Sequence, residues 1–510
     1  MKNGLARTAG FFHGAATTLC GVMLAASPWC FASVEKWWFW PMAGFIFAAA
    51  ACSGLGAMVE VIGGVRARPR VPARAVAALA LCLPFFAYAL WRAGRPSGPG
   101  SPLVVMEAER SLMLFATPWL LALSLCVSSG PRSRAAILRF LVANAVVVCV
   151  YAAVNHFLTG DMQILWVKGN DFHYVNRASA PFFCPNNYVD FATIFGFVAV
   201  AAAIAPRSRG PSPLARIGWL ALAAVFFGSG FLSASRWGLS AAFVSCVASL
   251  ALFGFRGRGF LTRVVFTALV LCAVVGGACA VRYTDNPLMS RVREHQFWKL
   301  WQNAESPKSA LRDLKFRQQI ADTFAYKFDR GQYIGAALRA WRSSPRFGIG
   351  PGQHTHRWAQ FEPTSDGVRR GPGGVPRLKR PRHSDYGKHL YEVHSDWTQL
   401  LEEYGTVGFA LFLPPLLFLL VALPLRQGAV QLRDAPALDR AAPLAAWMTL
   451  AMLCVHAIFD FPMQVPCLVW LTAGMCALGL LADAPSPTVV ETNGDACEEP
   501  CGQTMEASVR

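Results

Sequence analysis

Charged residues are scarce in this chain, at 15% of its 510 residues. Soluble domains carry about 25%, so this shortage, together with a mean hydropathy of +0.37, excludes an ordinary soluble protein. Acidic residues are the scarcer charged type, with 29 Asp and Glu against 47 Lys and Arg. The chain also lacks a DxD motif of the kind that commonly holds a divalent cation in nucleotide-sugar enzymes.

Long apolar segments dominate the sequence instead. Many reach or approach the ~20 residues that a helix needs to cross a bilayer. These segments are residues 11–31, 38–58, 72–91, 111–129, 136–158, 187–205, 214–233, 237–255, 261–281, 405–424, 441–460 and 464–482. Because no water satisfies the backbone inside the hydrocarbon, each segment must be a helix. We therefore predict an all-α polytopic membrane protein with about 12 transmembrane helices.

Basic residues in the short loops predict the orientation. Arginines gather after every second apolar segment, for example at Arg66, Arg132 and Arg256. Because such loops stay in the cytoplasm, both termini are expected there. The first 31 residues also fit a signal peptide, with Lys2 and Arg7 before an apolar core, but we expect a retained helix.

One long connection interrupts the alternation. Residues 283–397 are predicted to form a large, mostly helical periplasmic loop with 20 Lys and Arg against 11 Asp and Glu. Long loops translocate regardless of charge, and a basic excess suits an anionic ligand such as a lipid phosphate. The Gly- and Pro-rich run 369–383 suits a flexible linker near anionic headgroups instead. We predict nine transmembrane helices in residues 1–282, three more in 398–482, and a disordered cytoplasmic tail in 483–510.

Two polar stretches lie at the outer ends of apolar segments. Arg177 precedes a PNN tripeptide containing Asn186 and Asn187, where we expect a helix to start with an asparagine cap. Arg236 lies in SASRWGLS (233–240), a short outer turn that would hold it at the membrane surface. An arginine fixed there can grip a phosphate through its planar fork of donors. The alternative for both arginines is snorkelling toward the interface.

Two more stretches belong to the long loop. Apolar side chains at helical spacing after Arg330 place this arginine on the packing face of a helix. The glycines that follow, Gly350 among them, form a tight turn, which is weak evidence for phosphate binding. Asp396, with Gln399 three residues later, is expected to cap a helix and so to place His394 at its mouth.

A lone histidine is usually structural, but here one histidine and three arginines share the outer side of the membrane. A diphosphate needs two or more fixed cations, and a histidine, whose ordinary pKa is near neutrality, can act as a base toward a hydroxyl. Four other histidines are conceivable metal ligands with irregular spacing: His354, His356, His383 and His389. We predict neither a metal nor a cofactor.

These stretches resemble the O-antigen ligase and polymerase family of bacterial envelope enzymes. The resemblance rests on the arginine-plus-PNN stretch, the SRWG turn, the R-x14-P-x2-G-x-G-P-G element and HSDWTQLLEEYGTVGFALFL, in the family's order. IFDFPMQVP (458–466), with Asp460, is similar to the family's closing span. The similarity covers roughly residues 170–480, and Ser395 stands where the family usually has an asparagine.

The resemblance implies a GT-C-like fold in the bacterial inner membrane. It implies a donor glycan on undecaprenyl diphosphate and transfer to an acceptor hydroxyl, on lipid A-core, on a growing glycan or on a protein. Besides these substrates we expect contact with membrane lipids and no nucleic-acid partner. By position, Arg236 and Arg330 match two family arginines, and His394 matches the family's large-loop histidine.

We therefore predict an inverting, metal-independent glycosyltransferase with His394, Arg236 and Arg330 as catalytic residues. The predicted substrate-binding residues are Arg177, Asn186, Asn187, Gly350 and Asp396. Fixed guanidinium groups would stabilise the charge that builds on the departing diphosphate. His394 would either deprotonate and orient the acceptor hydroxyl or bond to the diphosphate, and both roles stay open.

Other readings stay open as well. Ligase, polymerase and protein O-oligosaccharyltransferase are alternatives within the family. A transporter or flippase for a lipid-linked glycan is an alternative of another class, and its essential charges would lie near the bilayer midplane. Asp190 and Asp460 are the candidates for that role. A structural scaffold would need none of these residues.

Overall fold

The structure is a computed structural model. It describes residues 2–65, 71–95, 105–165, 168–169, 174–179, 181–204, 212–253, 329–358, 361, 392–430 and 437–482. Within these ranges the regular structure is helical apart from β1 (Gln163–Ile164) and β2 (Lys168–Gly169), which pair antiparallel. The predicted all-α class is therefore confirmed for the described part of the chain.

The helices follow the apolar segments of the sequence. The first half contains α1 (Lys2–Ala26), η1 (Phe31–Ser33), α2 (Lys36–Gly63), α3 (Ala73–Leu81), α4 (Leu83–Ala93), α5 (Val105–Ser128) and α6 (Pro131–Thr159). The remainder contains α7 (Pro185–Ile204), α8 (Pro213–Phe231), α9 (Arg236–Phe253), α15 (Asp329–Ser343), α16 (His354–Arg357), α17 (Asp396–Val430), α18 (Ala437–His456), η5 (Pro462–Gln464) and α19 (Pro466–Leu481).

Among the described residues, 9 helices are long and apolar enough to cross a membrane. Gly238–Ser249 and Pro466–Leu481 are shorter apolar helices. Every predicted segment coincides with a helix except 261–281, which lies outside the described residues. A multi-pass membrane protein is thus confirmed. The count of twelve spans and the course of the long loop, of which 283–328 and 362–391 are not described, stay predictions.

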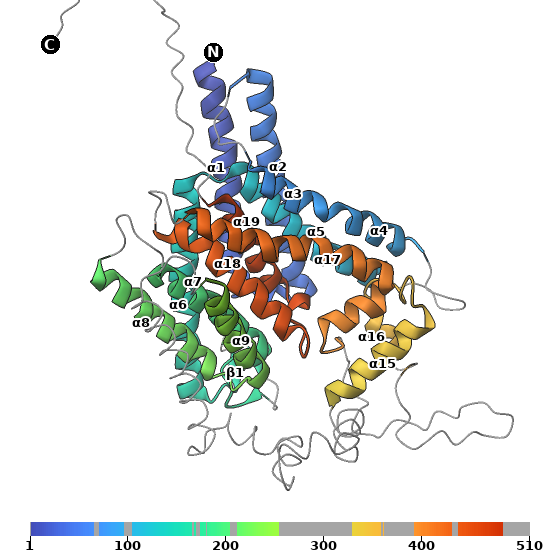
Figure 1. Cartoon of the computed structure of the whole chain (residues 1–510). Helices are drawn as coiled ribbons and strands as arrows, with labels where there is room; N and C mark the ends of the chain where they lie inside the picture. The colour runs from blue at the N-terminus through green and yellow to red at the C-terminus, as the bar shows by residue number, and fades with distance from the viewer. Residues whose placement is uncertain are drawn as a thin grey trace, which may run out of the picture.

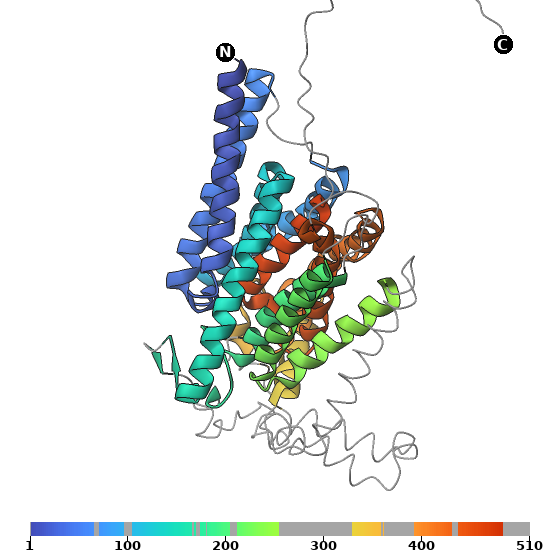
Figure 2. The same ribbon diagram turned by 90° about the vertical axis from the view of Figure 1, so that its left-hand side faces the viewer.

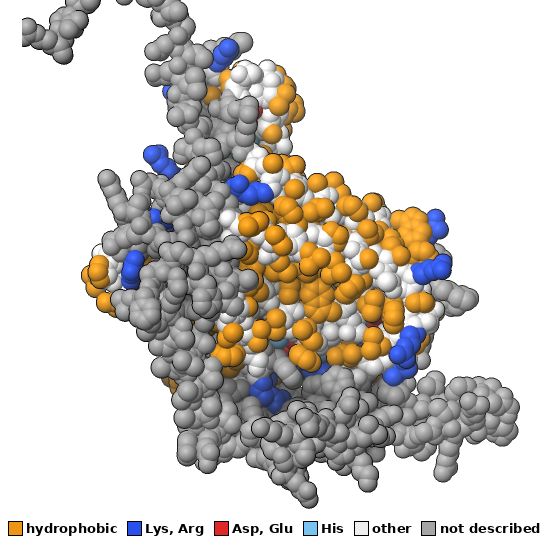
Figure 3. Space-filling view, viewed as in Figure 1, with side chains coloured by type: hydrophobic (Ala, Val, Ile, Leu, Met, Phe, Trp, Pro, Cys, Tyr) orange, Lys and Arg blue, Asp and Glu red, His pale blue; other side chains and the backbone are white. Residues whose placement is uncertain are grey.

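The centre of the bundle consists of α7 and α18. In their most apolar windows 89% and 83% of the residues are buried, whereas the figure is 17% in α17. Small residues on α18, such as Ala441 and Ala445, are fully covered and let neighbouring helices approach closely. On α17, Leu417 and Val421 stay exposed. Figure 3 shows a broad hydrophobic face with Lys and Arg at its margins, which suits contact with lipid tails.

The two ends of the molecule differ. Figures 1 and 2 show α1 and α2 side by side, extending beyond the other helices at the end where the N-terminus lies. In both views α15 lies toward the opposite end, at about the level of β1. This is the end that the charge pattern predicts to face the periplasm, and it carries most of the predicted site residues.

Candidate active site

Asp460 is the centre of a polar cluster in the turn that follows α18. Its side chain is fully buried. One carboxylate oxygen, Oδ2, lies 3.0 Å from Nη2 of Arg330 and accepts a 2.6 Å hydrogen bond from Nδ2 of Asn186. The other oxygen, Oδ1, lies 3.4 Å from Nδ1 of His394. Asp460 therefore joins the starts of α7 and α15 to the segment before α17.

Arg330 lies in the first turn of α15. Besides contacting Asp460, its Nη1 donates a hydrogen bond to the carbonyl of Phe459. The helix packs through small residues, with Ala337 and Ala340 fully buried. The predicted inward direction of Arg330 is thus confirmed. Its side chain keeps 17% exposure, so it is not fully enclosed by the cluster.

His394 is held between two aromatic rings. Its ring centroid lies 5.7 Å from that of Tyr333, in a stacked arrangement, and 4.9 Å from that of Phe461, edge to face. Its backbone has φ +58°, a left-handed conformation that few non-glycine residues adopt. Its side chain is 27% exposed, so one edge of the imidazole faces Asp460 while the ring stays accessible.

The start of α17 differs by one residue from the prediction. The helix begins at Asp396, and the Oγ of Ser395 accepts the hydrogen bond from the N–H of Thr398 over 3.4 Å. The carboxylate of Asp396 instead accepts a 2.7 Å hydrogen bond from the N–H of Met463. Ser395 is therefore the cap, and the predicted substrate-binding Asp396 fastens η5 to the start of α17.

Arg177 reaches the cluster through Asn186. Its Nε donates to the carbonyl of Ser233 over 3.0 Å, and its Nη2 donates to Oδ1 of Asn186 over 3.1 Å. Asn186 in turn donates to Asp460, so this asparagine is part of the cluster, and its predicted contact with substrate stays a prediction. The helix α7 starts at Pro185 as expected, but Asn186 and Asn187 then lie inside its first turn, so the predicted asparagine cap is wrong. Asn187 is buried, and its Oδ1 has no hydrogen-bond partner among the described residues.

Arg236 is the first residue of α9, so the predicted turn is shorter than 233–240 and ends before this arginine. The residues before and after that turn both pack against the cluster. Ser233 accepts the hydrogen bond from Arg177, and a Cβ on Gly238 would lie only 3.5 Å from Cε1 of His456. Arg236 itself is half-buried. Its backbone is therefore adjacent to the site.

Two residues outside the predicted set complete the cluster from inside the bundle. Nδ1 of His456 lies 2.8 Å from both carboxylate oxygens of Asp190, and its Nε2 lies 3.5 Å from Oδ2 of Asp460. All three side chains have 0% exposure. The signal was present in the sequence, because His456 and Asp460 stand four residues apart and Asp190 interrupts an apolar span.

The charges of the cluster determine the state of Asp460. Burial by itself would raise the pKa of this carboxyl. The Arg330 guanidinium, followed by the imidazoles of His394 and His456, overcomes the burial effect and holds the pKa of Asp460 well below its usual range. Asp460 is therefore a carboxylate at neutral pH and can orient donors on opposite sides.

The glycine turn after α15 is occupied by the protein itself. The N–H of Ile349 donates to the carbonyl of Glu402 over 2.8 Å, and the N–H of Gly350 donates to the carbonyl of Glu403 over 3.0 Å. Gly350 has φ +112° and Gly405, where α17 is broken, has φ +67°. This corrects the interpretation of Gly350 as a phosphate ligand, because the turn braces the break in α17.

Of the four histidines named as conceivable metal ligands, His354 has a partner within the protein. Nδ1 of His354 lies 2.8 Å from Oε2 of Glu402, and both side chains are buried. Burial disfavours the imidazolium, yet the Glu402 carboxylate raises the pKa of His354 above its ordinary value. Within the described ranges, no three His, Cys, Asp or Glu residues are arranged to hold a metal ion. His383 and His389 lie outside those ranges.

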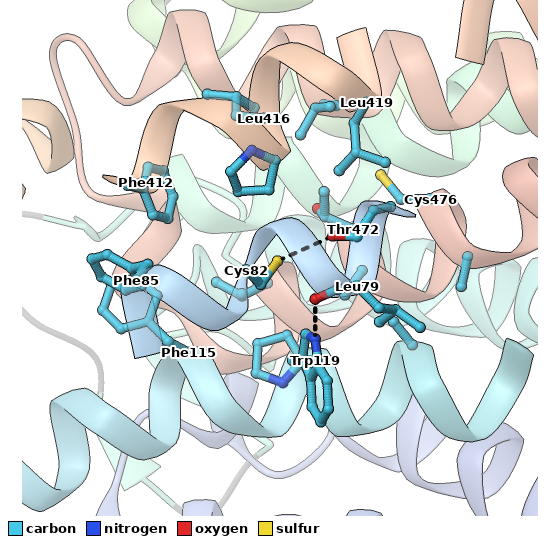
Figure 4. Close-up of a pocket in the computed structure, with 18 of the residues that line it drawn as sticks. Leu79, Cys82, Phe85, Phe115, Trp119, Phe412, Leu416, Leu419, Thr472 and Cys476 are labelled. Atoms are coloured by element: carbon cyan, nitrogen blue, oxygen red, sulfur yellow. Dashed lines mark hydrogen bonds between the residues drawn. The ribbon is translucent and has the colours of Figure 1, made fainter. Parts of the chain in front are cut away.

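An apolar cavity of about 230 Å³ lies between α3, α4, α5, α17 and α19. It follows α5 from Leu114 to Cys126 and α19 from Val469 to Leu480, which is roughly 16–18 Å at 1.5 Å per residue. Figure 4 shows aromatic rings, including that of Phe412, gathered at one end. Met463, three residues after Asp460 in the sequence, is one of its lining residues.

Comparison with known families agrees with the motifs. A family model described as O-antigen ligase matches residues 219–413. The matched region contains Arg236, Arg330 and His394, whereas Asn186 and Asp460 lie outside it. No curated protein matches the chain. The resemblance to the O-antigen ligase and polymerase family is thus confirmed.

Proposed function

We propose that this chain, which matches an O-antigen ligase family model over residues 219–413, transfers a glycan from undecaprenyl diphosphate to an acceptor hydroxyl on the periplasmic side of the inner membrane. The observation that carries the proposal is the meeting of Arg330, His394 and Asn186 on Asp460. These residues are far apart in the sequence. Their convergence puts a cation and a partly exposed imidazole in one place.

His394 is proposed as the general base. The Asp460 carboxylate next to Nδ1 favours the tautomer with its proton on that nitrogen. Nε2 is then a free acceptor for the proton of the attacking hydroxyl, the arrangement used by histidine–carboxylate pairs in other enzymes. The oxygen of that hydroxyl attacks the anomeric carbon opposite the diphosphate, the bond to the leaving diphosphate breaks, and the configuration inverts.

The diphosphate is proposed to bind to Arg236 and to the outward part of Arg330. Two donors of Arg330 are engaged by Phe459 and Asp460, so its remaining N–H groups contribute to the ligand. Arg177 is only 8% exposed, and two of its donors are engaged by Ser233 and Asn186. We therefore assign Arg177 to positioning Asn186 rather than to the diphosphate clamp.

The apolar cavity supports a lipid-linked donor. Its polar lining groups are satisfied within the protein, since Nε1 of Trp119 donates to the carbonyl of Leu79 over 2.9 Å and Oγ1 of Thr472 donates to the carbonyl of Leu468 over 2.7 Å. An elongated apolar cavity lined in part by Met463 suits a linear hydrocarbon chain attached to a diphosphate at Arg330.

The alternative of a lipid-linked glycan transporter is less well supported. Transport would need charges along a central path. Asp190 and Asp460 are instead fully buried and joined through His456, and neither lines the apolar cavity. Polymerase and protein O-oligosaccharyltransferase differ from ligase only in the acceptor, which none of the described contacts identifies.

The test is transfer by the purified protein in proteoliposomes, with an undecaprenyl-diphosphate-linked glycan and a lipid A-core acceptor. We expect R236A and R330A each to lose at least about 100-fold in rate, while the exposed Arg342 on the same helix offers R342A as a control that keeps activity. Full activity in both R236A and R330A would show that these two arginines do not hold the diphosphate. Product formed without lipid A-core would indicate the polymerase, and donor crossing the bilayer without transfer would indicate the transporter.

A further inference from the structure

The pair of His456 and Asp190 lies behind the proposed active site. Both carboxylate oxygens of Asp190 are 2.8 Å from one ring nitrogen of His456, and Asp460 lies 3.5 Å from the other. Neither residue of the pair reaches the surface. Ionisable groups inside a membrane protein are costly unless they serve a purpose, so the pair needs an explanation beyond packing.

The geometry favours one protonation state for His456. A neutral imidazole has one N–H and one lone pair. With a carboxylate at each ring nitrogen, the neutral form would direct that lone pair at a negative charge. An imidazolium directs an N–H at Asp190 and another toward Asp460, so the buried charges of the two carboxylates are balanced from within the bundle.

We propose that His456, held by Asp190, is a positioning residue that fixes the Asp460 carboxylate between Arg330 and His394. This inference rests on the proposed function, because it assigns the inner support of the same site. The pair fixes Asp460 from α7 and α18, the two most deeply buried helices of those described as long enough to span. Close packing keeps it in place, since a Cβ on Gly238 would lie 2.2 Å from Val189 and 3.5 Å from the His456 ring.

The arrangement has a consequence for His394. The charged groups that face Asp460 are Arg330 from α15, His394 before α17 and His456 from α18, with the neutral Asn186 from α7. Removing the positive charge of His456 leaves Asp460 less neutralised. The protonated form of His394 is then favoured, so the base is protonated at a higher pH than in the native protein.

The experiment compares H456N with the native protein and with H13N. His13 is a matched control, because it is equally buried and because, from α1, it pairs with Glu60 of α2 at 3.6 Å. In H456N we expect kcat to fall at least about tenfold with little change in KM for the donor, and the acid limb of the pH–rate profile to move up by about one unit. H13N is expected to leave both unchanged.

A second measurement does not depend on catalysis. The rate at which diethylpyrocarbonate modifies the partly exposed His394, followed by peptide mass spectrometry, reports its protonation at each pH. The midpoint is expected to rise in H456N and to stay in H13N. A midpoint that stays or falls in H456N, or an unchanged kcat, overturns the proposal. Absence of transfer by the native protein would instead count against the proposed function and leave this readout intact.

A double variant separates positioning from folding. H456N alone leaves the buried Asp190 carboxylate without its cation, which is expected to lower the thermal stability. D190N/H456N removes both charges and should restore much of that stability while the kcat stays as low as in H456N. If the double variant regains native kcat, the pair serves only folding and the positioning role is wrong.

Discussion

Two histidine–carboxylate groups lie near the start of α17, and they differ in what surrounds them. His354 and Glu402 are closed in, with exposures of 2% and 0%. His394 keeps 27% exposure beside the fully buried Asp460, and Arg330 keeps 17%. The first group braces a helix break, and the second leaves donors facing outward. A histidine or a glycine turn does not by itself indicate a functional site. Here the candidate site differs from the structural pair because its polar side chains remain accessible.

The largest expected difference is in catalysis. We expect H394A to lose transfer by at least about 100-fold, because a positioned general base contributes this much or more. H354A should keep a native kcat in the fraction that folds, although that fraction is smaller. The measurement is transfer rate per folded protein in proteoliposomes. Equal losses of kcat in both variants would erase the contrast between the two groups.

The glycine turn at Gly350 braces the break in α17 at Gly405, and this brace is expected to have the largest effect on stability. A Cβ on Gly405 would lie 2.4 Å from the carbonyl oxygen of Arg346, and the φ of +67° is unfavourable for alanine. G405A should therefore cost roughly 1–3 kcal/mol or more and lower the yield of folded protein. In G408A, three residues along the same helix, the added Cβ meets side chains, at 2.5 Å from Cβ of Tyr404 and 2.7 Å from Tyr88, and φ stays ordinary. The thermal midpoint in detergent is expected to fall further in G405A than in G408A, and the reverse order would contradict the brace.

The apolar cavity is expected to affect donor binding moderately. A473F would fill part of the cavity between α5 and α19, so we expect KM for a full-length polyprenyl donor to rise about tenfold. A short-chain donor, which does not enter the cavity, should show little change. Alanine 43 on α2, buried but away from the cavity, provides the control A43F. The same rise in KM for both donors would show that the cavity does not hold the chain.

The smallest expected effect is the pH dependence of the stability that the pair of His354 and Glu402 contributes. The folded-state pKa of His354 lies above its ordinary 6.5 because of Glu402. The stabilisation is therefore fully present below that ordinary value and is lost as the pH rises through the folded-state value. We expect the thermal midpoint to decline through this alkaline window in the native protein and to decline less in E402Q. For Asp460, whose pKa is lowered, the sign is opposite, and stability is lost only as the pH falls toward strong acid.

Much of the helical organisation could be predicted from hydropathy alone. The apolar segments agree with the described helices because a bilayer leaves the backbone no other structure. The inward direction of Arg330 also followed from helical spacing. Local patterns of this kind depend on neighbours within a turn or two, and a sequence contains that information directly.

The rest of the site depends on long-range contacts. Gly350 was interpreted as a phosphate ligand because a glycine turn looks alike whether its N–H groups meet a ligand or, as here, the carbonyl of Glu403. The cap of α17 was predicted at Asp396 but is Ser395, because serine and aspartate are both good caps. His456 was overlooked because its importance comes from Asp190, 266 positions away in the sequence.

The central claim is that His394 and Asp460 act as one unit with the bound donor. A double-mutant cycle tests it most directly, by comparing the transfer rates of H394A, D460N and H394A/D460N in proteoliposomes. For residues that act together, losses do not multiply, so the double variant should be about as slow as H394A. Rates that fall by the product of the two single losses, or a fully active D460N, would contradict the account.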